Sequence, residues 1–344
     1  PSSAKKVLRS NPFLRMQITL TNFPFFGRIF YFYLKRKLRN PLQHIAIHQH
    51  QLTSGRKLDI NLSYQTFGQD LLSAPIVLIN HALTGNSGVC GDNGWWNRLV
   101  GETLPVDLHR FAILCFNIPG NGYDGVFIAD TSDITTKDIA SIFLEGLKFL
   151  KIEKLFALIG GSIGGSIGWE MLVQQHSLAK YFIPIATDFK TSDWLHSQCL
   201  VQKFLLESEK KTLETARIHA MLCYRTPESI NFRFKNENDA EKQIRKSECW
   251  LNFHGKTLNE RFSLQAYRFM NHLLMNIGVP EVEIKYINAE IHLIAIDTDL
   301  FFPAFEIKRS FDLLQENKQN VYYHELKSIH GHDAFLMEYE QLNQ

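Results

Sequence analysis

The sequence of 344 residues predicts an α/β fold in which a mostly parallel sheet is flanked by helices and carries an inserted all-helical segment. From about residue 44, short β-branched and aromatic runs alternate with longer helical patterns, which is typical of parallel sheets. From about Thr191 to Asn276, helical patterns rich in Lys, Glu, Leu and His replace the strand pattern. The length therefore fits one large core with an insertion.

Short runs of residues that favour extended backbone predict the strands of the sheet. A helix is expected from Asp138 to Leu150, because apolar residues recur there at helical spacing on one side. The expected strands are Ile45–Gln51, Asp59–Thr66, Ile76–Asn80, Phe111–Asn117, Leu155–Ile159, Tyr181–Ala186, His292–Ile296 and Val321–Leu326.

The helical block divides the chain into an arm of residues 1–42, a core of residues 43–190 and 277–344, and a lid of residues 191–276. Within the lid, Thr226 suits an N-cap and Pro227 suits the first helical position, followed by Glu228 in the first turn. A helix should therefore begin there, so that two helices meet near Tyr224.

Charge is distributed unevenly along the chain. Residues 1–42 hold nine Lys and Arg and no acid, whereas the rest holds 28 basic and 35 acidic residues. An acidic body without a basic stripe argues against nucleic-acid binding and favours small-molecule chemistry. The basic, aromatic arm would suit a membrane surface or a targeting peptide. A processed end or flexible tail explains it at least as well, so membrane contact is the weaker interpretation.

The five cysteines lie at least 24 residues apart, without a CxxC pair and in odd number. This pattern fits neither a zinc site nor a disulfide set, and it favours a reducing cytoplasm. The longest apolar stretch, Phe23 to Leu34, is shorter than the roughly 18 residues of a membrane span and contains Arg28.

The main chemical motif is Gly160-Gly161-Ser162-Ile163-Gly164, which follows an apolar strand and precedes a helical run. A G-x-S-x-G sequence between strand and helix predicts a nucleophile elbow. Small residues are needed beside the serine because the turn is sharp and strained. Ser162 is therefore the candidate nucleophile.

A serine nucleophile needs a base and an acid that orients the base. Asp297 and Asp299 follow one late strand, and the loop after the last strand carries His330 and His332. The order Ser, Asp, His, each after a strand, predicts a hydrolase-type triad.

The oxyanion formed by serine attack needs preorganised donors. The Ile163 amide should supply one, and the loop after Ile76–Asn80 should supply the other. His81 in that loop is interpreted as a structural residue that hydrogen-bonds the loop.

Several motifs together resemble the homoserine O-acetyltransferase family, in order and with fitting spacing over roughly residues 45–340. The resemblance implies an α/β-hydrolase core with a helical lid, a homodimer formed through that lid, and a role in methionine biosynthesis. The motifs are His81–Gly85, Gly160–Gly165, Ala216-Arg217 with Tyr224–Thr226, Asp299–Pro303 and Gly331–Leu336.

By this resemblance Ser162 is the acyl nucleophile, His332 the general base and acid, and Asp299 the orienting acid. Asp299 is preferred to Asp297 because it begins the family's Asp-Leu-Phe-Phe-Pro landmark. The resemblance also places the oxyanion hole at the amides of Leu83 and Ile163.

The resemblance further implies that Arg217, Tyr224 and Asp333 bind the amino-acid substrate. Arg217 and Tyr224 are seven residues apart, about 10 Å along one face of a helix. A guanidinium can bind the carboxylate of the amino acid, and Asp333 can pair with its ammonium group.

The expected reaction is acetyl transfer from acetyl-CoA, used as a substrate, through an acyl-serine to homoserine, without a metal or a tightly bound cofactor. Phe262–Tyr267 and Pro119–Asp124 depart from the family's pattern near the expected donor tunnel. Acetyl or succinyl donors, and homoserine or serine acceptors, therefore stay open, as do the residues that hold the CoA phosphates. A carboxylester hydrolase or thioesterase with the same triad, and a non-catalytic module on this fold, also stay open.

Overall fold

The computed structural model describes residues 41–208, 210–317 and 320–344. Over these residues an eight-stranded sheet has the order β1-β2-β6-β3-β7-β8-β9-β10. The first strands pair antiparallel, β1 with β2 and β2 with β6, and the remaining pairs are parallel. The strands are β1 Gln43–Gln51, β2 Lys57–Gly68, β3 Ile76–Asn80, β6 Ala112–Phe116, β7 Leu155–Gly161, β8 Ala179–Ile185, β9 Glu290–Ile296 and β10 Val321–Leu326.

Alternate residues of the central strands enter two cores on opposite faces of the sheet. In β3, Leu78 belongs to one core and Val77 and Ile79 belong to the other. Helices α4 (Thr136–Phe149), α5 (Ile163–Gln174) and α12 (Ala304–Asn317) contact the strands. This burial of central strands on both faces explains their near-continuous apolar sequences.

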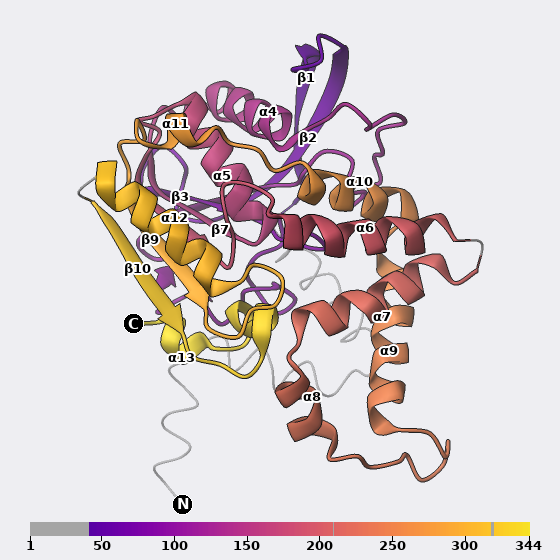
Figure 1. Cartoon of the computed structure of the whole chain (residues 1–344). Helices are drawn as coiled ribbons and strands as arrows, with labels where there is room; N and C mark the ends of the chain where they lie inside the picture. The colour runs from indigo at the N-terminus through magenta and orange to yellow at the C-terminus, as the bar shows by residue number, and fades with distance from the viewer. Residues whose placement is uncertain (1–40, 209, 318–319) are drawn as a thin grey trace, which may run out of the picture. The chain divides into compact units, whose positions relative to one another are not determined.

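Between β8 and β9 the described chain is helical apart from its connections. The helices of the predicted insertion are α6 Asp193–Glu207, α7 Thr212–Tyr224, α8 Pro227–Phe234, α9 Lys246–Arg261 and α10 Leu264–Met275, and the short α11 (Glu281–Ile284) follows them before β9 (Figure 1). As expected, α8 begins with Pro227, and the Thr226 side chain accepts a hydrogen bond from the amide of Ser229. Helix α7 ends at Tyr224, so the two helices meet where the sequence predicted.

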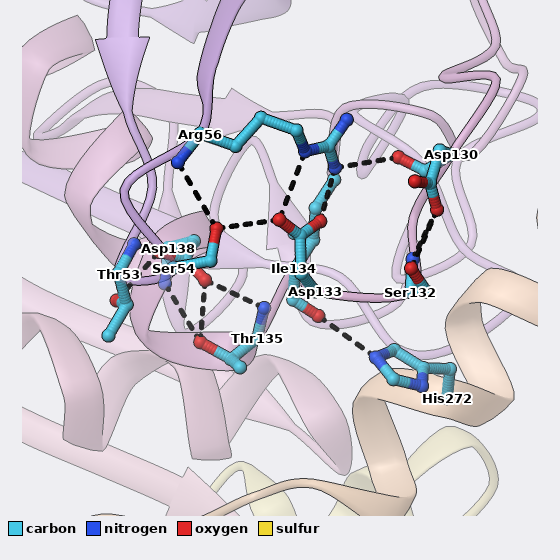
Figure 2. A network of polar contacts seen from close by, with 10 residues as sticks. All are labelled: Thr53, Ser54, Arg56, Asp130, Ser132, Asp133, Ile134, Thr135, Asp138 and His272. Carbon is cyan, nitrogen blue, oxygen red and sulfur yellow. Dashed lines mark hydrogen bonds and ion pairs between the residues drawn. The ribbon is translucent and has the colours of Figure 1, made fainter.

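A polar network joins the turn after β1 to the segment before α4 and to α10 (Figure 2). Arg56 forms an ion pair with Asp133, and this guanidinium holds the pKa of the Asp133 carboxyl at about 2. Asp138 accepts hydrogen bonds from the amide and hydroxyl of Thr53, at 2.6 and 2.7 Å. His272 of α10 lies 3.1 Å from the carbonyl oxygen of Ile134, the residue that follows Asp133. The network therefore fastens the last helix of the insertion to the core.

The predicted α/β class and the eight predicted strands are confirmed, with ends that differ by a few residues. The sequence did not predict a two-stranded sheet of β4 (Val100–Gly101) and β5 (Val106–Asp107). Three helices were also not predicted: α11 (Glu281–Ile284), α12 and α13 (Tyr339–Leu342). The expectations for the arm fall almost wholly outside the described residues. Within the described ranges, the structure has no helix with the length and apolarity needed to cross a membrane.

Candidate active site

Ser162 occupies the turn between β7 and α5, with φ 55° and ψ −133°. Such backbone strain in a non-glycine residue is typical of functional turns. The neighbouring glycines are required by space: a Cβ on Gly160 would lie 2.4 Å from the carbonyl carbon of Gly164, and one on Gly164 would lie 2.3 Å from the Asn80 carbonyl oxygen. The small residues thus let helix α5 approach β3 closely and present the serine at its N-terminus.

Ser162, His332 and Asp299 meet at the carboxyl ends of β7, β9 and β10. His332 Nε2 lies 3.0 Å from Ser162 Oγ, and His332 Nδ1 lies 2.7 Å from Asp299 Oδ2. All three residues are buried. The arrangement can pass a proton from the serine hydroxyl to Nε2 while the carboxylate stabilises the imidazolium.

Asp299 is itself held in place by the backbone. Its Oδ1 accepts hydrogen bonds from the amides of Phe301 and Phe302, at 2.7 and 2.9 Å. These bonds leave Oδ2 for His332. Asp297, the second carboxylate after the same strand, instead accepts a bond from the Ser328 amide and lies 3.8 Å from Lys327. The contacts of Asp297 are therefore with Ser328 and Lys327 rather than with the histidine.

Aromatic rings surround the His332 imidazole. The ring centroids of Phe301, Phe302, Phe335 and Tyr224 lie 5.1 to 5.7 Å from the imidazole centroid. The helical segment Gly331–Leu336 that carries His332 was expected as a loop, and it forms a 3-10 helix. The rings fix the imidazole and limit the access of water to it.

The loop after β3 lies against the elbow. The side-chain Nδ2 of Asn80 donates to the Gly164 carbonyl oxygen at 3.1 Å, and Leu83, whose backbone amide is a proposed oxyanion donor, is buried. Ile163, the other proposed donor, begins α5, where the first amides of a helix have no partner within the helix. Both amides thus belong to segments that contact each other beside Ser162.

His81 braces this loop. Its Nδ1 lies 2.8 Å from the Ala82 carbonyl oxygen, so it carries the proton, and its Nε2 accepts from the Ile118 amide at 3.0 Å. Burial lowers the pKa of His81 to about 4. A neutral, doubly bonded imidazole fits the structural interpretation. Asn121, from one of the segments that depart from the family pattern, also contacts Nε2.

The residues expected to bind the amino acid gather next to His332. The Arg217 guanidinium lies over the Tyr224 ring, 5.6 Å from its centroid, and that ring contacts the imidazole. Burial raises the pKa of the Asp333 carboxyl, and Arg217, His332 and Arg225 oppose that rise. A guanidinium and a carboxyl group therefore lie beside the base, which are the groups that a zwitterionic amino acid would require.

Further residues of this region were not predicted from the sequence. Arg225 forms an ion pair with Asp333, and Arg261 donates to the Thr84 carbonyl at 3.0 Å, next to Leu83. Tyr267, at the end of the second departing segment, is buried beside Tyr224, and burial raises its pKa to about 12. The sequence could have indicated these residues by their position, because each lies within or next to a motif that the sequence analysis discussed.

The parts of the chain that the structure describes contain no group of three His, Cys, Asp or Glu side chains arranged to hold a metal ion. A reaction without a metal or a tightly bound cofactor stays a prediction of the sequence.

Residues 75–198 match the model of the alpha/beta hydrolase fold. A homoserine O-acetyltransferase from Cyclobacterium marinum is 30% identical over 322 residues, covering 85% of this chain and 90% of the relative. One from Carboxydothermus hydrogenoformans is 27% identical, with the same coverage of both chains.

Solved structures share the fold. The crystal structure of homoserine O-acetyltransferase from Bacillus anthracis has a TM-score of 0.77 at 17% identity and covers 88% of this chain and 98% of its own. That of esterase E22 has a TM-score of 0.76 at 16% identity and covers 87% and 96%. At such identities the likeness concerns the fold alone.

Proposed function

The chain belongs to the homoserine O-acetyltransferase family, and on this premise we propose that it transfers an acetyl group from acetyl-CoA to the hydroxyl of homoserine. The reaction would proceed in two steps through an acetyl ester of Ser162. The pathway that the family suggests is methionine biosynthesis, in the cytoplasm.

In the first step Ser162 Oγ attacks the thioester carbonyl and gives its proton to His332 Nε2, 3.0 Å away. The Leu83 and Ile163 amides donate to the oxyanion of the tetrahedral intermediate. When the carbon–sulfur bond breaks, His332 returns the proton to the CoA sulfur. The products are free CoA and the acetyl-enzyme.

In the second step the homoserine hydroxyl gives its proton to His332 and attacks the acetyl carbon. The ester bond to Ser162 breaks, and His332 protonates the serine oxygen that leaves. Throughout both steps, Asp299 Oδ2 accepts the hydrogen bond from the Nδ1–H of His332, at 2.7 Å. Water competes at this step, so the aromatic enclosure of the imidazole favours transfer over hydrolysis.

The observation that carries this proposal is the pair of opposite charges beside the base. Arg217 can bind the acceptor's carboxylate, and Asp333, which directly follows His332, can bind its ammonium group. A simple ester hydrolase or thioesterase has no need of such a pair. A hydrolase function is therefore disfavoured, although it would use the same triad.

The test is thiol release from acetyl-CoA and succinyl-CoA, each with homoserine, serine or no acceptor, while the acylated product is followed by mass. Release that depends on homoserine and yields O-acetylhomoserine supports the proposal. Release with succinyl-CoA or serine instead would change the donor or acceptor. Release that ignores the amino acid would indicate a hydrolase, and no release would indicate a non-catalytic module.

A homodimer formed through the lid is part of the same proposal. It is supported by large apolar side chains that lie exposed on the helices of the insertion. They include Trp194, Phe204, Leu222, Phe232 and Phe253. Exposed apolar side chains are typical of interfaces where they form a continuous patch.

A further inference from the structure

We propose that Arg225 is a positioning residue that keeps Asp333 ionised and aimed at the acceptor's ammonium group. The inference rests on the proposed function, because it assumes that Asp333 binds the ammonium group of an amino acid. We place Arg225 behind Asp333 rather than against substrate, because its guanidinium nitrogens already contact Ser229, His330 and Met337. It would act through Asp333.

The Arg225 guanidinium has polar contacts on several sides. Its Nε and Nη2 donate to Ser229 Oγ at 3.1 and 2.6 Å, and its Nη2 lies 2.9 Å from His330 Nδ1. Its Nη1 lies 3.3 Å from Met337 Sδ and 3.9 Å from Asp333 Oδ2. These contacts fix the orientation of the cation and direct Nη1 toward the carboxylate.

The two segments that carry Arg225 and Asp333 are also joined without using the arginine. The Thr226 hydroxyl donates to the Ile329 carbonyl oxygen. Gly331 has φ +64°, and a Cβ there would lie 2.8 Å from the Tyr224 carbonyl oxygen. The Tyr224 ring also contacts the His332 ring. Because backbone and ring contacts hold the segments together, replacing Arg225 should leave the site assembled.

The charges around Asp333 explain why a second arginine is needed. Burial and Asp299 favour the neutral form of the Asp333 carboxyl, whereas Arg217, His332 and Arg225 favour the charged form. When an acceptor binds, its carboxylate offsets the charge of Arg217. In this proposal Arg225 does not bind the acceptor's carboxylate, so its charge stays available to Asp333 when the ammonium group must be bound.

This division of roles predicts which step depends on Arg225. Formation of the acyl-enzyme from the donor does not involve Asp333, so the rate of this step should not change when Arg225 is replaced. Binding of the acceptor needs the Asp333 carboxylate, so the KM for homoserine should rise. The acid limb of kcat/KM for homoserine should also move to higher pH, because loss of a neighbouring cation raises the pKa of a carboxyl.

The experiment compares Arg225→Gln with Arg225→Lys, which retains the charge, and with Arg233→Gln as a control. Arg233 lies exposed on α8, which begins two residues after Arg225, and its guanidinium lies 5.5 and 5.7 Å from the ring centroids of Phe234 and Trp250. For each protein, thermal melting, the burst of CoA release without acceptor, and KM and kcat for homoserine from about pH 6 to about pH 9 are measured.

We expect Arg225→Gln to raise the KM about tenfold or more while the burst rate changes by less than about twofold. Arg225→Lys should recover part of the loss, and Arg233→Gln should behave as the unchanged protein. An unshifted KM and pH profile in Arg225→Gln, or an equal loss in the burst, would overturn the inference while the proposed function stands. If the unchanged protein transfers nothing to homoserine, the proposed function fails and the inference fails with it.

Discussion

Replacing Asp299 with Asn should abolish most activity while leaving the fold intact. Oδ1 of residue 299 accepts two backbone hydrogen bonds, from Phe301 and Phe302, and an asparagine oxygen can keep both. Its NH₂ group then faces His332 Nδ1, where the carboxylate oxygen lay 2.7 Å away. The imidazole must present a lone pair to this donor, so its proton moves to Nε2. In that tautomer Nε2 cannot accept the proton of Ser162.

The wrong tautomer costs about 10⁴-fold in kcat in a serine triad, which equals about 5 kcal/mol of transition-state stabilisation. The assay is CoA release with homoserine near neutral pH, together with thermal melting. Asp297→Asn is the matched control, because Asp297 contacts Ser328 and Lys327 rather than the histidine. An Asp299→Asn variant within about tenfold of the unchanged protein, or an equally inactive Asp297→Asn, would refute the reasoning.

Gly164→Ala should lower the free energy of unfolding in urea by about 1–3 kcal/mol or more, because its Cβ would meet the Asn80 carbonyl oxygen at 2.3 Å. Gly278→Ala, whose Cβ has nothing within 4 Å, should change it little, and equal effects would contradict the packing argument. Burial raises the pKa of Glu170 to about 7 in the folded protein, from 4.5. As the pH rises, the carboxyl therefore loses its proton in the unfolded chain before it does so in the folded protein, and the free energy of unfolding falls between about pH 4.5 and about pH 7. Glu170→Gln removes that slope and should gain up to about 3 kcal/mol by pH 7 in urea titrations, whereas a gain independent of pH would refute the assignment. Phe232→Glu combined with Phe253→Glu should convert a lid-mediated dimer to a monomer by light scattering, and an unchanged mass would move the interface elsewhere.

Local patterns were sufficient for most of the sheet and for the elbow. The strands were predictable because the central ones are buried on both faces and read as continuous apolar runs. Ser162 was predictable because only small residues allow the close approach of α5 to β3. Helix α12 was missed even though Ile307, Phe311 and Leu314 recur at helical spacing. Strands β4 and β5 have two residues each, too few for any periodicity to appear.

Contacts between distant segments explain the rest. The ion pair of Arg225 with Asp333 joins the insertion to the last segment of the core, and no local pattern reports such a pair. The choice of Asp299 over Asp297 depends on where the backbone amides after β9 point. From the sequence that choice rested on the family resemblance, and the hydrogen bonds now give it a physical basis.

The most direct test of an acyl-serine transferase is to trap the intermediate. The enzyme is mixed with acetyl-CoA, quenched in acid, and weighed intact, and the modified peptide is then sequenced by mass spectrometry. We expect one added acetyl group on Ser162, which homoserine removes much faster than water does and which Ser162→Ala never gains. An acetyl group on another residue, or one that water removes as fast as homoserine does, would rule out transfer through an acyl-serine.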